Sequence, residues 1–196
     1  MPIKNLLYNY KIECIEIFLN RAFAISDEYS IIQQEFQTLS ASQHEYYPKT
    51  FSDLEHRIDI LLGYQNIVFR AVYMELNAIV ELELKRLATS IQLKQNKKPT
   101  KLNRKNAFSI IENEYGLGIR NLPCFEKMDE IRKIANAYKH SDGVKSVCEE
   151  QTNDTTIKLG YCKKRYNLSF DKAKSSIEAV KDFMKALPGE RQQIYE

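Results

Sequence analysis

Glycine and proline are scarce in this chain, with six glycines and five prolines among 196 residues. Because these residues interrupt regular structure, the long segments between them favour helices. The chain also lacks a run of about 18 apolar residues, the length that a membrane-spanning helix requires. Its first residues, "MPIKNLLYNYKIEC", lack the apolar run of a signal peptide. We therefore expect a soluble cytoplasmic protein without a membrane partner.

The four cysteines show neither CxxC spacing nor a histidine at metal-ligand spacing. This argues against a structural zinc site and fits a reducing compartment, where Cys148 and Cys162 could lie opposite each other in a hairpin as a free pair. No glycine-rich phosphate loop is present either. We expect neither a metal nor a cofactor. The formal net charge of +3 is too small to indicate nucleic-acid binding, so a basic surface requires local clustering.

Apolar residues recur every three or four positions in up to five segments, which predicts four or five helices. The expected ranges are 3–39, 52–91, 106–115, 124–140 and 169–187. The second begins with "SDLE", the pattern of a capping box. Between the last two, residues such as Ile157, Leu159 and Tyr161 alternate with polar ones, which indicates a β-hairpin. The sequence predicts an all-α, up-and-down helical bundle with a small β-hairpin inserted before the last helix.

The expected helix at 124–140 has one apolar and one polar face. Its core stripe consists of Met128, Ile131, Ala135 and Tyr138, and a second row, of Arg132, Asn136 and His140, lies well off that stripe. Such a row could hold a phosphate and move a proton beside it, since imidazole titrates near neutral pH. The alternative is a solvated helix end, where histidine and lysine favour the helix dipole.

The stretch "DEIRKIANAYKHSDG" resembles the signature helix of HEPN-domain proteins, and "VYMELNAIVELELKRLA" resembles the central helix of that family. The resemblance covers roughly residues 54–188. It implies a HEPN-like bundle over residues 51–190 and leaves residues 1–50 as an N-terminal helical extension. The family consists of small, mostly dimeric bundles, so the resemblance also implies a homodimer.

In that signature an Arg, usually followed by Asn, precedes a His by four to six residues. His140 matches the His and Asn136 the polar position, whereas Ala135 stands where the family has Arg. Arg132 lies one turn earlier on nearly the same face, and Lys139 is another candidate cation. The resemblance thus implies His140, Arg132 and Asn136 as catalytic candidates, with Lys139 and Lys133 as substrate-binding ones.

Active HEPN ribonucleases cleave RNA without metal, by attack of the 2′-hydroxyl on the adjacent phosphate. The resemblance therefore implies an RNA-directed protein, as a metal-independent endoribonuclease of a prokaryotic defence or toxin system with an antitoxin as partner. Other members are inactive modules that bind a protein or a nucleotide, and Ala135 shifts weight toward them. A structural helical adaptor stays open if the signature is coincidental.

Residues 94–105 form a basic segment without an acidic residue. Lys98 and Lys101 within it are candidate RNA contacts, because lysines attract phosphates regardless of sequence. No aromatic residue is interleaved on which a base could stack. A solvated connector between two helices is the alternative interpretation of this segment.

Overall fold

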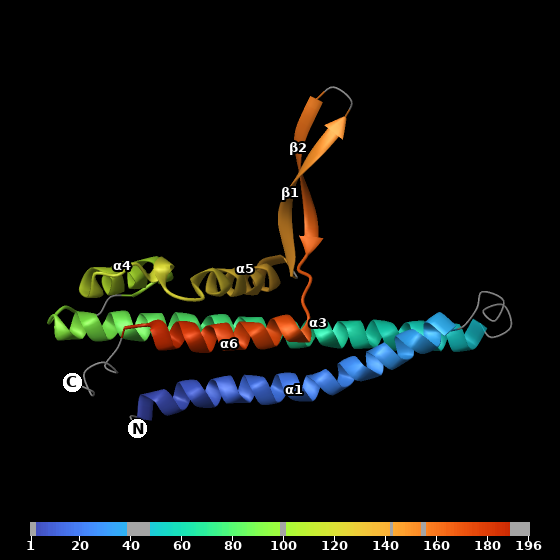
Figure 1. The fold of residues 1–196 in the computed structure, drawn as a ribbon, viewed down its shortest axis with the longest axis horizontal. Helices are drawn as coiled ribbons and strands as arrows, with labels where there is room; N and C mark the ends of the chain where they lie inside the picture. Colours follow the sequence, from blue (N-terminus) through green and yellow to red (C-terminus); the bar gives the residue numbers. More distant parts are fainter. Residues whose placement is uncertain (1–2, 39–47, 99–100, 142, 154–155, 189–196) are drawn as a thin grey trace. The chain divides into compact units, whose positions relative to one another are not determined.

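The computed structural model describes residues 3–38, 48–98, 101–141, 143–153 and 156–188. The chain is mostly helical over these ranges, which confirms the main feature of the predicted class (Figure 1). None of the described helices is long and apolar enough to cross a bilayer. In order, the elements are α1 (Ile3–Thr38), α3 (Pro48–Lys94), α4 (Arg104–Tyr115), η1 (Ile119–Asn121), α5 (Phe125–Ser141), β1 (Val144–Asn153), β2 (Thr156–Arg165) and α6 (Phe170–Ala186).

The chain divides into two compact units, Met1–Val72 and Tyr73–Glu196, with the boundary inside α3. The predicted division after residue 50 stays a prediction. In the first unit, α1 packs on the first part of α3 around a small apolar cluster. Ile32, Leu54 and Leu61 are buried there, and Tyr29 and Ile58 pack against them.

Helix α3 begins at Pro48, whereas the sequence predicted a start near Ser52. Proline suits the first turn of a helix because the N–H that it lacks would have no partner there. The helix ends in a left-handed residue, Asn96 at φ 56°. The N–H of Lys97 donates to the carbonyl of Gln92 at 2.8 Å, and asparagine tolerates this conformation better than most residues.

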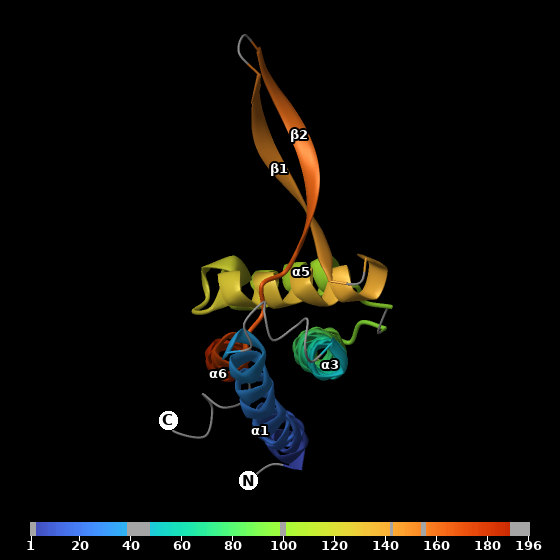
Figure 2. The same cartoon turned by 90° about the vertical axis from the view of Figure 1, so that its right-hand side faces the viewer.

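In the second unit, α6 lies beside the later part of α3, and α4 and α5 lie together on one side of this pair (Figure 2). The hydroxyls of Ser176 and Tyr73 share a buried hydrogen bond of 3.3 Å between α6 and α3. The rings of Phe108 and Phe125 meet edge to face at 6.1 Å, which joins α4 to the start of α5. The largest fully buried side chains of this unit are Tyr73, Leu76, Ile79, Leu84, Ile111, Ile119, Met128, Ile131, Ile134 and Phe183.

The ends of the shorter helices follow from local chemistry. Asn103 caps α4 by accepting a hydrogen bond from the N–H of Asn106 at 2.8 Å, and Gly116 ends α4 at φ 63°. Ser169 caps α6 by accepting a hydrogen bond from the N–H of Lys172 at 3.2 Å.

Between α5 and α6, β1 and β2 pair antiparallel over ten residues each and extend away from α4 and α5 (Figure 1). The register pairs Cys148 with Tyr161 and Val147 with Cys162. The two cysteines are therefore not directly opposite each other, in contrast to the sequence expectation, because the register is shifted by one residue.

Candidate functional site on helix α5

One face of α5 is buried by packing against the rest of the second unit. The four predicted core residues, Met128, Ile131, Ala135 and Tyr138, are all buried, which confirms the stripe. Ile134 is buried as well, and the spacing argument missed it because it considered a narrower stripe than the helix presents to its neighbours. With this face fixed in the core, the remaining face of α5 points to solvent.

The candidate residues on the polar face differ in exposure. Asn136, Lys139 and His140 are exposed, and the Lys133 side chain is 60% exposed, whereas that of Arg132 is only 33% exposed. The side chains of Asn136 and His140 make no hydrogen bond or ion pair with any other residue in the described ranges.

The structure does not bring Arg132 and His140 together. They are eight residues apart on one helix, which separates their backbones by about 12 Å along its axis. Asn136 lies midway, about 6 Å from each. One chain therefore offers a row of separate polar groups, and not a convergent cluster.

Arg132 is held by Asp129, one turn earlier. Its Nη2 lies 2.8 Å from Oδ1 of Asp129 and its Nε lies 2.9 Å from the same oxygen. Lys133 Nζ lies 3.0 Å from the other carboxylate oxygen. Partial burial alone would raise the pKa of Asp129, but the hydrogen bonds from Lys133 and Arg132 outweigh it and lower that pKa. The candidate cation of the site is thus already paired with an internal anion.

Arg104, the first residue of α4, belongs to the same cluster, although the sequence analysis counted it only as part of the basic segment. Its guanidinium lies over the Phe108 ring, 5.3 Å from the centroid, and interacts electrostatically with Arg132, Asp129 and Glu81. Desolvation, and then the like charge of Arg132, lower the pKa of Arg104. Both terminal nitrogens are buried and have no hydrogen-bond acceptor among the described residues.

A sequence signal for Arg104 did exist. Asn103 is a good N-cap, which makes Arg104 the first helical residue and places Phe108 one turn further along the same face. Lys98 and Lys101, by contrast, are exposed in the connection before α4. The structure shows no contact between these two lysines and α5, and their role stays a prediction.

The end of α5 is closed by Gly143 at φ 76°. Its N–H donates to the carbonyl of Ala137 at 3.1 Å, and its own carbonyl accepts from the N–H of Tyr166 at 3.1 Å. A Cβ atom at this position would lie 2.7 Å from Cε1 of Tyr138. Glycine is therefore required here both by the backbone conformation and by the close approach of the Tyr138 ring.

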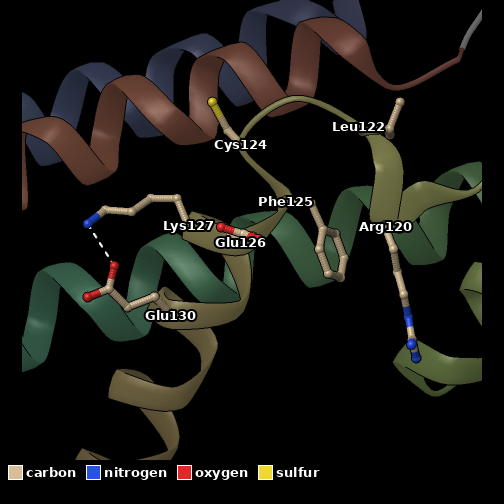
Figure 3. A pocket seen from close by; sticks show the side chains of 7 residues that line it. All are labelled: Arg120, Leu122, Cys124, Phe125, Glu126, Lys127 and Glu130. Atoms are coloured by element: carbon tan, nitrogen blue, oxygen red, sulfur yellow. Dashed lines mark hydrogen bonds and ion pairs between the residues drawn. The ribbon is translucent and has the colours of Figure 1, made fainter.

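A separate depression of about 550 Å³ lies where η1 leads into α5 (Figure 3). It is lined by Arg120, Leu122, Cys124, Phe125, Glu126, Lys127 and Glu130. Two of these lining residues form an ion pair, with Lys127 Nζ 2.7 Å from Glu130 Oε2. None of the predicted site residues lines it. In the described ranges, no three His, Cys, Asp or Glu side chains are grouped so that they could hold a metal ion.

Compared with known protein families, curated proteins and solved structures, the chain matches none of them. What the fold and the site define is a mostly helical protein in which the side of α5 that is not buried carries basic residues, acidic residues and an asparagine.

Proposed function

We propose that this chain is an HEPN-like RNA-directed protein, in which the solvent face of α5 binds the phosphates of RNA. The observation that supports this most is that four polar side chains of α5 are exposed while the apolar stripe of the same helix is buried. These four are Lys133, Asn136, Lys139 and His140. Cationic and amide side chains in a row follow the spaced charges of a nucleic-acid backbone, and such contacts do not require a particular base sequence.

Metal-independent cleavage is the more demanding form of this proposal. The 2′-oxygen would form a bond to phosphorus while the bond from phosphorus to the 5′-oxygen breaks, which leaves a cyclic phosphate and a 5′-hydroxyl. A base must accept the 2′-proton, and an acid must protonate the leaving oxygen. His140 is the candidate for these proton transfers because its side chain is exposed and has no partner among the described residues. A cation must also stabilise the negative charge that develops on the phosphate oxygens in the transition state.

The geometry of one chain supports binding better than cleavage. Arg132 is paired with Asp129 and lies about 12 Å along the helix from His140, and Ala135 stands where the signature has its Arg. The cation next to His140 is the exposed Lys139. A second copy could bring Arg132 and His140 to one phosphate. Self-association is supported by Ile60 and Ile67, seven residues apart on α3, which are 56% and 65% exposed.

A binding test distinguishes these forms of the proposal. We expect a fluorescent single-stranded RNA to bind with a strong salt dependence, and Arg132→Ala to reduce the salt slope by about 1. Arg86→Ala is a control of the same kind, because Arg86 is likewise paired with an acid three residues earlier, Glu83 at 2.7 Å. RNA that binds wild type and a variant with Lys133, Lys139 and His140 all changed to alanine with equal affinity and salt slope would remove α5 as the interface.

A cleavage test uses the same RNA in the presence of a chelator. If the wild-type protein cuts RNA, His140→Ala should abolish cutting while circular dichroism shows intact folding. His56→Ala is the control, since His56 is an exposed histidine on α3. RNA that is bound but never cut supports the inactive binding module instead, for which the Asp129–Arg132 pair is the structural argument.

A further inference from the structure

The cluster around Asp129 has more cationic groups than its one carboxylate satisfies. Arg132 and Lys133 both contact that carboxylate, at 2.8 and 3.0 Å, and Arg104 interacts with it electrostatically without a hydrogen bond. Glu81 on α3 also faces Arg104, but its carboxylate is engaged by Asn77 at 3.3 Å and by Lys85 at 3.5 Å. Asp129 is therefore the anion for which three cations compete.

Arg104 is the least satisfied of the three. Its terminal nitrogens reach neither water nor an acceptor among the described residues, and only the Phe108 ring partly compensates. A buried guanidinium without an acceptor is unfavourable. Asp129 is one of the two carboxylates whose charge acts on Arg104, so a change of side-chain conformation that brought the Asp129 carboxylate to the Arg104 guanidinium would supply the missing acceptor.

We propose that the Asp129 carboxylate changes its partner when a phosphate group binds Arg132. The carboxylate then leaves the Arg132 guanidinium and pairs with the Arg104 guanidinium. This inference rests on the proposed function for its ligand, the phosphate groups of RNA. The exchange preserves the pairing of Asp129, because one guanidinium replaces another. The exchange leaves Arg132 and Lys133, both of which reach solvent, available to a phosphate. Arg132 can bind it through paired N–H donors, and Lys133 can bind it as a point charge. Arg104 is thus a positioning residue and does not touch the ligand.

The exchange can be tested without RNA, by nuclear magnetic resonance titration of the Asp129 carboxyl group. We expect the pKa of Asp129 to stay below its ordinary value in Arg132→Met, because Lys133 still donates to the carboxylate and Arg104 takes the place of Arg132. In Arg104→Met it should change little. In the double variant it should rise by more than the two single changes together. Compared with the double variant, a protein with Arg104→Lys and Arg132→Met should have a lower pKa of Asp129, because the lysine supplies a cation again. Arg86→Met should leave the pKa of Asp129 unchanged.

Two results of this titration would overturn the exchange. In one, Arg132→Met raises the pKa of Asp129 as much as the double variant does. In the other, the titration of Glu81 responds to loss of Arg132 and that of Asp129 does not, which would make Glu81 the acceptor for Arg104. Methionine is a suitable replacement because it fills a similar volume and leaves no buried charge behind.

A binding cycle with a fluorescein-labelled twelve-nucleotide uridine RNA tests the consequence. Arg104→Met should weaken binding about tenfold, a typical coupling between two sites. Asp129→Asn should tighten binding, because Arg132 is then free. In the Asp129→Asn background, Arg104→Met should have no further effect. An equal loss in both backgrounds would contradict the exchange and make Arg104 a direct contact. If wild-type protein binds no RNA while the titration is non-additive, the proposed function fails and the exchange stands.

Discussion

Replacing Gly143 by alanine should destabilise the second unit more than the loss of a helix-ending glycine alone explains. Gly143 has φ 76°, a conformation that costs a residue with a Cβ about 1–2 kcal/mol. The new Cβ would also lie 2.7 Å from Cε1 and 3.0 Å from Cζ of Tyr138. Because Tyr138 is buried, the ring cannot turn away freely, and overpacking of this kind costs about 1–3 kcal/mol. The expected total loss is about 2–5 kcal/mol.

Gly116 provides a matched control in the same unit. It ends α4 at φ 63°, but a Cβ there would meet nothing within 4 Å. Gly116→Ala should therefore cost only the backbone share, about 1–2 kcal/mol. Gly63 lies within α3, and a Cβ there would also meet nothing within 4 Å. Gly63→Ala should therefore raise the free energy of unfolding by about 0.5–1 kcal/mol.

The assay is urea unfolding followed by circular dichroism, with the free energy of unfolding compared at constant m-value. The decisive quantity is the difference between the losses in unfolding free energy of Gly143→Ala and Gly116→Ala, which does not depend on the total stability of the protein. Equal losses for Gly143→Ala and Gly116→Ala would refute the claim that the Tyr138 ring packs against Gly143.

Two further predictions concern Tyr73 and the basic segment. Burial raises the pKa of Tyr73, so its stabilising effect is complete below about pH 10 and is lost as the pH rises through the folded-state pKa. Tyr73→Phe should lower stability at pH 8 by about 1 kcal/mol and flatten the loss between pH 9 and 11, as measured by urea unfolding. Changing Lys98 and Lys101 together to serine should weaken RNA binding and reduce its salt slope by about 2, whereas Lys49→Ser should not. An unchanged slope in a binding titration would make the segment a connector.

Helix ranges could be predicted closely where local periodicity and capping determine them. The expected range 3–39 corresponds to Ile3–Thr38 of α1, and the range 124–140 corresponds to Phe125–Ser141 of α5. The start of α3 was placed four residues late, because a proline that ends one segment can equally begin the next helix. Boundaries that depend on one backbone N–H are harder to predict than stripes that repeat over several turns.

The candidate site was only partly predictable for a different reason. The Asp129–Arg132 pair is local, three residues apart on one helix, and the sequence contains the signal for it. The approach of Arg104 depends on how α4 packs against α5, and no local pattern records such packing. Sequence reasoning therefore recognised the polar row of α5 but did not include the ion pair that Arg132 makes with Asp129.

The separation of Arg132 and His140 leads to a test of whether a second copy completes the site. Each group must approach one phosphate closely, and in one α5 helix they are about 12 Å apart along the axis. In a symmetric dimer, Arg132 of one protomer can meet His140 of the other, and each dimer then has two such sites.

Arg132→Ala and His140→Ala proteins should then each be inactive in RNA cleavage. A mixed dimer of the two variants has one site that retains both groups and one that lacks both. With random pairing of equal amounts, half of the dimers are mixed, so cleavage should recover to about a quarter of the wild-type rate. Active wild-type protein whose co-expressed variants recover no cleavage would show that Arg132 and His140 do not act across a dimer interface.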